Sequence, residues 1–254
     1  MKNILVTGGS GKAGRATINL LLKNNYNVFN VDLANHSELD APFSKVNLEN
    51  FGDAMESVSE IDDRINGIDA IIHQAAIPAP GLETNHKTFR INTLSTYNIF
   101  QAAKVLKINN IVWASSETVL GLPFDTYPPY VPVDEEYYPR PESSYSLSKV
   151  MGEEMARQYC RRNPEMKIFG LRYSNIMEEK DYKQFQSFQK DPFLRKWNFW
   201  GYIDARDVAQ ACLLAMESKL KGAENFIIAA DDTVMEEDNK SVSYTHLRAH
   251  ETSD

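Results

Sequence analysis

Tyr145 and Lys149 are two side chains whose types and spacing suit proton transfer. Residues four apart on a helix share one face, so the phenol and the ammonium group would lie next to each other. An ammonium group favours the phenolate. We therefore expect Lys149 to lower the pKa of Tyr145 and Tyr145 to act as an acid/base group. The same spacing also occurs by chance on solvated helix faces, so the interpretation needs support from other motifs.

Two serines supply a hydroxyl group at a second place. Ser115 and Ser116 end the apolar run 111–114, which predicts a strand. Ligands of open α/β sheets bind beyond the carboxyl ends of the strands. A hydroxyl group there can hydrogen-bond the substrate oxygen whose carbon exchanges a hydride.

Three glycines in G-x-x-G-x-x-G spacing follow the apolar run 4–6 and precede a helical pattern. Glycines allow a tight turn and let the backbone approach a pyrophosphate, towards which the new helix points unpaired N–H groups. The loop is therefore expected to bind the phosphates of a dinucleotide through Gly8, Gly11, Lys12, Ala13 and Gly14.

An acid closes the next apolar run, at Asp32. A carboxylate there can bind both ribose hydroxyls of NAD and would repel the extra phosphate of NADP. A glycine-rich turn without a ligand would explain the loop but not Asp32. The sequence thus predicts NAD as the cofactor.

These motifs lie on alternating strand and helix patterns. The strand runs lack clean alternation of apolar and polar residues, which favours a parallel sheet covered on both faces. Strands are expected near 3–7, 27–32, 44–47, 68–74, 110–115, 166–172 and 224–229, and helices near 12–24, 50–64, 84–107, 143–162 and 204–218. The predicted fold class is α/β, a doubly wound parallel sheet.

With these motifs in order, the chain resembles the extended short-chain dehydrogenase/reductase family, in its NAD-dependent epimerase/dehydratase branch. The resemblance covers residues 2 to about 235. Besides the motifs above, it rests on the segments 73–76, 171–175 and 202–209, which read HQAA, LRYSN and YIDARDVA.

The resemblance implies roles for individual residues. Ser116 would orient the substrate oxygen, Tyr145 would be the acid/base, and Lys149 would tune it and hold the nicotinamide ribose. Asn175 would meet the diphosphate or sugar of the substrate. Further cofactor contacts are implied at Asn47, Leu48, Ala75, Ala76 and Asn92.

The chain departs from relatives at three places. Asn47 stands where they usually have an aspartate that meets adenine, and Leu120 stands where they have a tyrosine. Residues 176–179 read IMEE where sugar-nucleotide epimerases often read VYGP. The last departure favours a substrate other than a nucleotide sugar.

We expect an NAD-binding Rossmann domain over 1–173, to which 204–230 returns, and a partial C-terminal substrate lobe over 174–203 and beyond about 230. The proline-rich segment 121–142 is long enough for a binding loop or lid. Aromatic residues of the lobe, including Trp197, can pack it against the sheet or stack against a sugar, and the sequence favours neither alternative enough to assign them to the site.

Composition restricts the partners. The net charge of −8 argues against a nucleic-acid surface, and no apolar run approaches a membrane span. Cys160 and Cys212 fit core positions of a reduced, cytoplasmic protein, and the histidines show no metal-ligand spacing. In relatives, helices corresponding to 84–107 and 143–162 pair across a two-fold axis, so a homodimer is expected.

The predicted function is an NAD-dependent oxidoreductase of the epimerase/dehydratase type, acting on a sugar or nucleotide sugar. A uronate or aldose dehydrogenase of the same superfamily is the alternative. A non-catalytic NAD-sensing module is a third, although a sensor would not need Ser116, Tyr145 and Lys149.

The last residues need a separate interpretation. From Val242, the chain resembles a translated transposase-type sequencing adapter. We expect residues from about 241 to 254 to be a non-native tail that belongs to no folded element, and the native lobe to be truncated.

Overall fold

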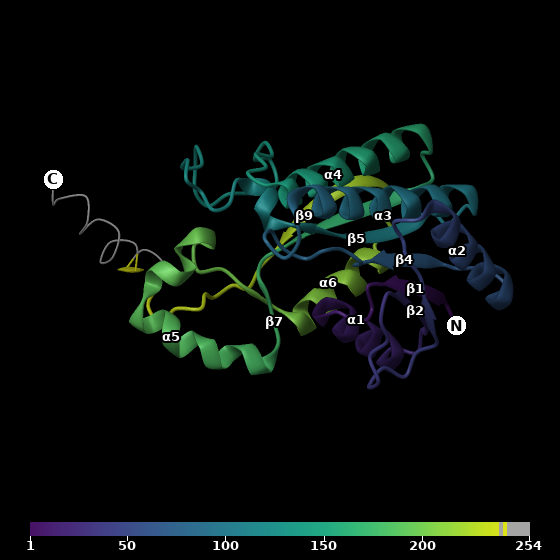
Figure 1. Cartoon of the computed structure of the whole chain (residues 1–254), viewed down its shortest axis with the longest axis horizontal. Helices are drawn as coiled ribbons and strands as arrows, with labels where there is room; N and C mark the ends of the chain where they lie inside the picture. Colours follow the sequence, from purple (N-terminus) through teal and green to yellow (C-terminus); the bar gives the residue numbers. More distant parts are fainter. Residues whose placement is uncertain (239–240, 243–254) are drawn as a thin grey trace.

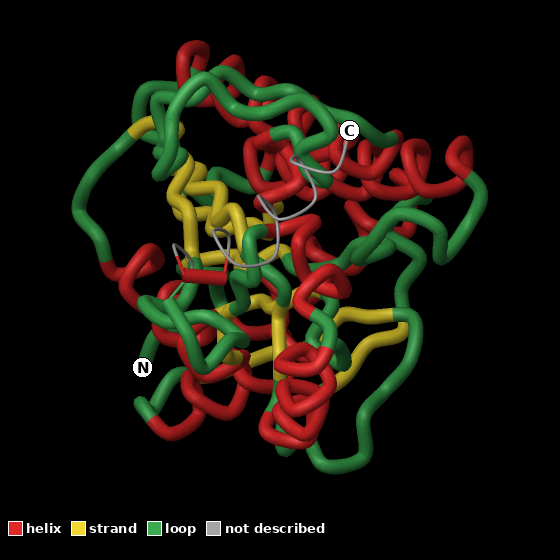
Figure 2. The backbone as a smooth tube through the Cα atoms, turned by 90° about the vertical axis from the view of Figure 1, so that its left-hand side faces the viewer, coloured by secondary structure: helices red, strands yellow, loops and turns green. Residues whose placement is uncertain are grey.

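The computed structural model describes residues 1–238 and 241–242. Its centre is a seven-stranded sheet in the order β3-β2-β1-β4-β5-β6-β9, and every neighbouring pair of strands is parallel. Helices α2, α3 and α4 cover one face and α1 and α6 cover the other (Figures 1 and 2). The predicted doubly wound α/β fold is confirmed.

The observed elements lie close to the expected ones. The strands of the sheet are β1 Asn3–Thr7, β2 Asn27–Asp32, β3 Phe43–Lys45, β4 Ala70–His73, β5 Asn110–Ser116, β6 Lys167–Tyr173 and β9 Gly222–Ile228. The main helices are α1 Lys12–Lys23, α2 Phe51–Ile65, α3 Asn85–Val105, α4 Ser144–Arg162 and α6 Ala205–Glu217.

Alternate residues of each strand enter two separate cores. In β1, Leu5 belongs to the cluster under α2, α3 and α4, whereas Ile4 and Val6 belong to the cluster under α1 and α6. All seven residues of β6 are buried. Both faces of the sheet are therefore covered, which explains why the strand runs in the sequence lack polar alternation.

The segment that the sequence predicted as a substrate lobe, here called the lobe, consists of short elements that periodicity did not predict. They are β7 Ile176–Met177, η2 Glu179–Gln184, α5 Phe185–Lys190, η3 Pro192–Asn198 and β8 Ile203–Asp204, where η marks a 3-10 helix. In Figure 1 the segment around α5 stands apart from the sheet, with β7 leading towards it. The division of the chain into two domains stays a prediction.

The expectation for the C-terminal residues is wrong at Val242. Its N–H donates to the carbonyl of Asp238, and its side chain is buried in a cluster with Trp200 and Val234. Val242 thus packs in the lobe because its side chain is apolar. Residues 243–254 lie outside the described residues, so their assignment as a non-native tail stays a prediction.

Two further sequence expectations can be compared with the structure. Cys160 and Cys212 are both free and buried, as expected. Within residues 1–238 and 241–242, no helix is long and apolar enough to cross a membrane. The expected cytoplasmic location stays a prediction.

A buried set of hydrogen bonds connects α4 to β5 and β6. The Arg172 guanidinium donates to both carboxylate oxygens of Glu153 at 2.9 Å, and the Ser115 hydroxyl donates to Glu153 Oε1 at 2.7 Å. The side chains of Glu153 and Arg172 are only 3% and 4% exposed. Because Glu153 lies one turn beyond Lys149, these contacts fix the register of the helix that carries Tyr145 and Lys149.

Replacing Glu153 by Gln should destabilise the protein by about 3–5 kcal/mol, because the Arg172 charge stays buried without its partner. Urea unfolding followed by circular dichroism measures this change. Glu154→Gln is the matched control, because Glu154 lies on the same helix with its side chain 44% exposed, and it should change stability by less than about 0.5 kcal/mol. Equal effects of the two variants would contradict this role of Glu153.

Candidate active site

A cavity of about 940 Å³ opens at the carboxyl ends of the central strands. Of the residues predicted from the sequence, those that line it are Gly8, Gly11, Lys12, Ala13, Gly14, Asp32, Ala76, Ser116, Tyr145, Lys149 and Asn175. The fold therefore brings together the glycine loop, the acid after β2, the serine after β5 and the Tyr-Lys pair of α4.

The three glycines of the loop have different structural roles. A Cβ on Gly8 would lie 2.5 Å from the Ala75 nitrogen, and a Cβ on Gly14 would lie 2.2 Å from the Gly8 oxygen, so both sites exclude side chains. Gly11 precedes α1 without a side-chain cap, and its Cβ would meet only the Gly8 oxygen, at 3.4 Å. The N-terminus of α1 is therefore open to an anion, and the loop fits the pyrophosphate of a dinucleotide.

Asp32 is held in place at the other end of this loop. Its carboxylate accepts hydrogen bonds from the N–H of Ser10 at 2.9 Å and from the N–H of Leu33 at 2.7 Å. These contacts fix the carboxylate at the wall of the cavity, where it has further lone pairs for ribose hydroxyls.

Four predicted cofactor residues do not line the cavity. The Asn47 side chain accepts from the Glu49 N–H, and Leu48 is buried in the core. Ala75 packs its backbone against Gly8. The contacts of these three residues with a cofactor stay a prediction.

Asn92 is the fourth, and its amide is already used by the protein. Its Oδ1 accepts from the Ile77 N–H at 2.8 Å, and its Nδ2 donates to the Ile77 carbonyl at 3.0 Å. Asn92 therefore fixes the segment after β4, in which Ala76 and Pro78 line the cavity. The contact of Asn92 with a cofactor stays a prediction.

Ser116, Tyr145 and Lys149 lie together in the wall of the cavity. Tyr145 hydrogen-bonds Ser116, and Lys149 Nζ lies 5.6 Å from the centre of the Tyr145 ring. Lys149 Nζ donates to the Ala114 carbonyl at 2.7 Å. All three side chains are buried, so water competes little for these contacts.

The expectation that Lys149 lowers the pKa of Tyr145 is wrong in this structure. Burial raises the Tyr145 pKa to about 12, the hydrogen bond with Ser116 opposes this rise, and the nearby Glu117 charge adds to it. Burial also lowers the pKa of Lys149 to about 8. The ammonium group interacts with the Ala114 carbonyl rather than with the phenolic oxygen, which explains why desolvation dominates.

The sequence reasoning missed Glu117, which also lines the cavity. Its side chain accepts from Asn198 Nδ2 at 3.2 Å, and burial raises its pKa to about 7. The only signal in the sequence that could have identified Glu117 as a site residue is its position directly after Ser116. Trp197, for which the sequence left packing of the lobe and stacking on a sugar open, lines the cavity as well.

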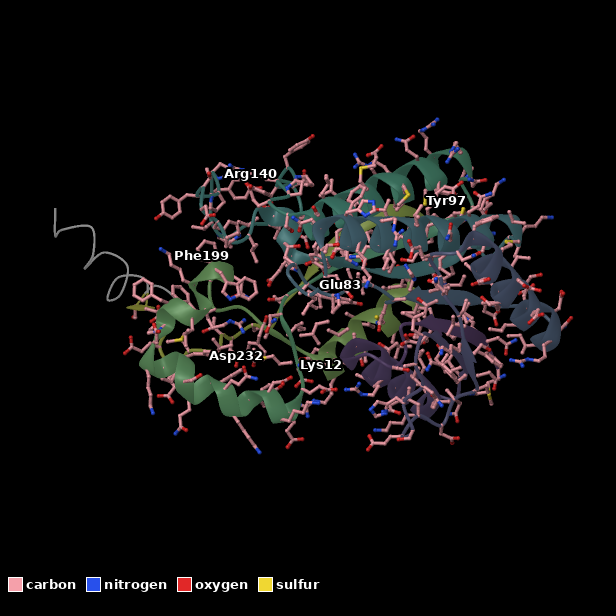
Figure 3. All side chains as sticks on the ribbon, in the orientation of Figure 1. Lys12, Glu83, Tyr97, Arg140, Phe199 and Asp232 are labelled. Atoms are coloured by element: carbon pink, nitrogen blue, oxygen red, sulfur yellow. The ribbon has the colours of Figure 1, made fainter. Side chains whose placement is uncertain are left out.

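Two ion pairs connect the glycine loop to the lobe. Lys12 pairs with Asp181, and Arg15 pairs with Glu178. The Lys12 label in Figure 3 lies where the lobe meets the first helix. The cofactor half and the lobe half of the cavity are therefore joined at its rim.

The family of this chain follows from its similarity to known proteins. A model of the NAD dependent epimerase/dehydratase family matches residues 4–229. The chain belongs to this family. The match confirms the resemblance seen in the sequence, the assignment to an enzyme family and NAD as the family's cofactor.

Individual relatives differ in what their names say. A bifunctional UDP-glucose 4-epimerase and UDP-xylose 4-epimerase from Arabidopsis thaliana is 31% identical over 188 residues, which cover 68% of this chain and 52% of the relative. An L-arabinose 1-dehydrogenase (NAD(P)(+)) from Haloferax volcanii is 27% identical over 243 residues, and these cover 91% of this chain and 90% of the relative. The chain thus spans about half the length of the plant epimerases that it matches.

A solved structure supports the fold. UDP-glucose 4-epimerase from Brucella ovis in complex with NAD has a TM-score of 0.72 and 20% identity, and the match covers 92% of this chain and 80% of that one. At this identity the likeness shows the shared fold.

Asp32→Ala should narrow the difference in affinity between NAD and NADP, because it removes both the acceptor for the ribose hydroxyls and the charge that repels the phosphate. Isothermal titration calorimetry with each cofactor measures the ratio. Asp63→Ala, on the exposed face of α2, should leave the ratio unchanged. Equal affinities of the unmutated protein for NAD and NADP would contradict the assignment of Asp32.

Proposed function

We propose that this protein oxidises or reduces a carbinol or carbonyl carbon of a sugar with NAD. The observation that carries the proposal is the convergence of Ser116, Tyr145 and Lys149 in the same cavity as the glycine loop and Asp32. A module that only binds NAD has no need for a buried tyrosine, serine and lysine beyond the phosphate loop. The relatives named as sugar epimerases and a sugar dehydrogenase support the substrate class.

NAD, when bound, supplies the acceptor or donor of a hydride. The protein has to place the sugar carbon beside it and to move the hydroxyl proton. In the reducing direction, the neutral Tyr145 phenol, favoured by its pKa of about 12, donates its proton to the carbonyl oxygen. In the oxidising direction, the phenolate accepts the hydroxyl proton. Ser116, which hydrogen-bonds Tyr145, orients the same oxygen.

Two reaction outcomes share this chemistry. In an epimerase the hydride returns to the opposite face of the same carbon, and in a dehydrogenase the reduced cofactor leaves. A free-sugar dehydrogenase is the second candidate. The match to the L-arabinose 1-dehydrogenase from Haloferax volcanii extends along 90% of that relative's length, which supports this candidate. Release of NADH distinguishes the two outcomes.

Tyr145→Phe should lower turnover by roughly two to four orders of magnitude and leave NAD affinity nearly unchanged, because it removes only the phenolic hydroxyl. Turnover of sugars is followed by NADH absorbance and by chromatography of product isomers. Tyr159→Phe is the matched control, since Tyr159 lies on the same helix and its hydroxyl donates to Gln101 outside the cavity. Normal turnover by Tyr145→Phe would refute the proton-transfer role.

We also propose a homodimer through α3 and α4. These helices pack together and carry apolar side chains that are 40% to 47% exposed, namely Leu94, Tyr97, Val105, Leu147 and Met151. Figure 3 labels Tyr97 on this layer, away from the lobe. Other apolar residues of the two helices, such as Ile99, Phe100 and Ala156, pack in the core, so the exposed ones are the group that a second copy would cover.

The double substitution Leu94→Arg/Met151→Arg should convert the dimer into a monomer, because four charges would be buried at the interface. Small-angle scattering at micromolar concentration gives the mass. Leu214→Arg, at a side chain 59% exposed on α6, places a charge on the opposite layer and should leave the dimer intact. A monomeric mass for the unmutated protein would overturn the proposal.

A further inference from the structure

Glu117 is the buried acid of the cavity that the proton-transfer scheme does not use. It follows Ser116 directly, it is 9% exposed, and it lines the cavity together with Ser174, Asn175 and Trp197. Asn198 Nδ2 donates to Glu117 Oε1 at 3.2 Å, and hydrogen bonds with the Ser174 side chain and the Asn175 backbone also favour its ionised form. A carboxylate has about four lone-pair sites, so the group keeps some acceptor capacity for a ligand.

The cation whose charge acts on this acid is Arg195, and its guanidinium group already donates hydrogen bonds to other protein groups. Arg195 Nη1 donates to Asn175 Oδ1 at 3.1 Å, and Nη2 donates to the Gly201 carbonyl at 2.5 Å. The guanidinium group also lies 5.2 Å from the centre of the Trp197 ring. Arg195 is 5% exposed and does not line the cavity. It holds the Asn175 side chain, and its charge acts on Glu117 from within the protein and lowers the pKa of that carboxyl group.

The two lysines that line the described cavity are also engaged. Lys12 pairs with Asp181 at the rim, and Lys149 donates to the Ala114 carbonyl beneath Tyr145. Within the described residues, the part of the wall around Glu117 thus presents a carboxyl, an amide and an indole, without a free cation. A substrate anion buried there would lack a partner and would face the Glu117 charge, which is costly.

Hydroxyl groups fit the same wall well. A carboxylate oxygen accepts hydrogen bonds from sugar hydroxyls, the Asn175 amide can donate one, and the Trp197 ring offers an apolar face to the C–H groups of a sugar. Arg195 holds Asn175 through its carbonyl oxygen, which leaves the amide N–H groups as the part of that side chain available to a ligand.

We propose that the cavity selects uncharged free sugars over uronates and sugar nucleotides, and that Glu117 is the residue that discriminates. This inference rests on the proposed sugar oxidoreductase function and adds the substrate class. Burial raises the Glu117 pKa to about 7, so the carboxyl is mainly ionised at pH 8, where its repulsion of substrate anions is strongest.

Ligand-observed saturation-transfer NMR with the NAD-bound protein at pH 8 tests the selection directly, because it detects binding without turnover. Matched pairs that differ only in charge are used as probes: glucose with glucuronate, and galactose with galacturonate, together with UDP-glucose. We expect the neutral sugars to bind at least about tenfold more tightly than their uronates, and UDP-glucose not to displace them. This difference corresponds to the free energy of about one unfavourable charge contact.

Glu117→Gln keeps the shape of the side chain and removes its charge. It should bring the affinities for each neutral sugar and its uronate within about threefold of each other. Glu142→Gln, at an exposed acid outside the cavity, should keep the preference of the unmutated protein. Circular dichroism establishes that both variants fold, and the comparison on the unmutated protein needs no variant.

The possible results separate this inference from the proposed function. Tighter binding of a uronate or of UDP-glucose would overturn the inference, and turnover of those ligands would at the same time support the oxidoreductase function. Binding of neutral sugars without NADH or isomer formation would support the inference and count against the function. No binding of any neutral sugar, or an unchanged preference in Glu117→Gln, would overturn it.

Discussion

The buried contacts of Glu153 fix α4 against β5 and β6, and the geometry of the site depends on this constraint. Tyr145 and Lys149 reach the cavity from α4, whereas Ser116 reaches it from the end of β5. A rotation or shift of α4 would separate the phenol from the serine hydroxyl. Because Glu153 accepts from both Ser115 and Arg172, it secures the helix to two neighbouring strands at once.

A second constraint acts at the phosphate end. Gly8 and Gly14 let the loop after β1 pack closely against its own backbone and against Ala75, which brings the N-terminus of α1 over the switch between β1 and β4. Dinucleotides bind at such a switch because the connections from the two strands leave towards opposite faces of the sheet, which opens a crevice at the carboxyl ends of the strands. The sheet therefore places the glycine loop and the group of Ser116, Tyr145 and Lys149 along one continuous cavity.

The sequence predicts the cofactor half better than the substrate half, for a physical reason. Gly8, Gly11, Gly14 and Asp32 act through local backbone geometry, and that geometry is encoded within a few residues. The parallel sheet is likewise encoded in long apolar runs. The lobe contains short 3-10 and α segments, such as α5, that are too short for a periodic signal.

The burial of Glu117 and the pKa of Tyr145 depend on contacts between distant parts of the chain, which local sequence patterns do not predict. Glu117 is buried because Asn198 packs against it from 81 positions further along the chain, and no local pattern encodes that contact. The Tyr145 pKa depends on how deeply α4 and the segments around the cavity bury the phenol. The Tyr-x-x-x-Lys spacing correctly predicted that the two side chains share a cavity, but it did not predict the balance between burial and charge.

The ion pairs of Lys12 and Arg15 connect the first helix to the lobe at the rim of the cavity. Both cations belong to the first turns of α1, and both acids belong to the segment just after β7. The side chains are partly exposed, so each pair contributes little to stability by itself. Their effect is on position, since they hold the lobe that carries Asn198 and Trp197 close to the cofactor loop.

The central claim is that the cavity brings a sugar carbon next to the nicotinamide ring under the control of Ser116 and Tyr145. A crystal structure of the protein with NAD and a bound sugar tests it most directly. The account predicts a sugar carbon about 3–3.5 Å from nicotinamide C4, with its hydroxyl hydrogen-bonded to Ser116 and Tyr145. A nicotinamide ring directed away from Tyr145, or a sugar bound outside this cavity, would contradict it.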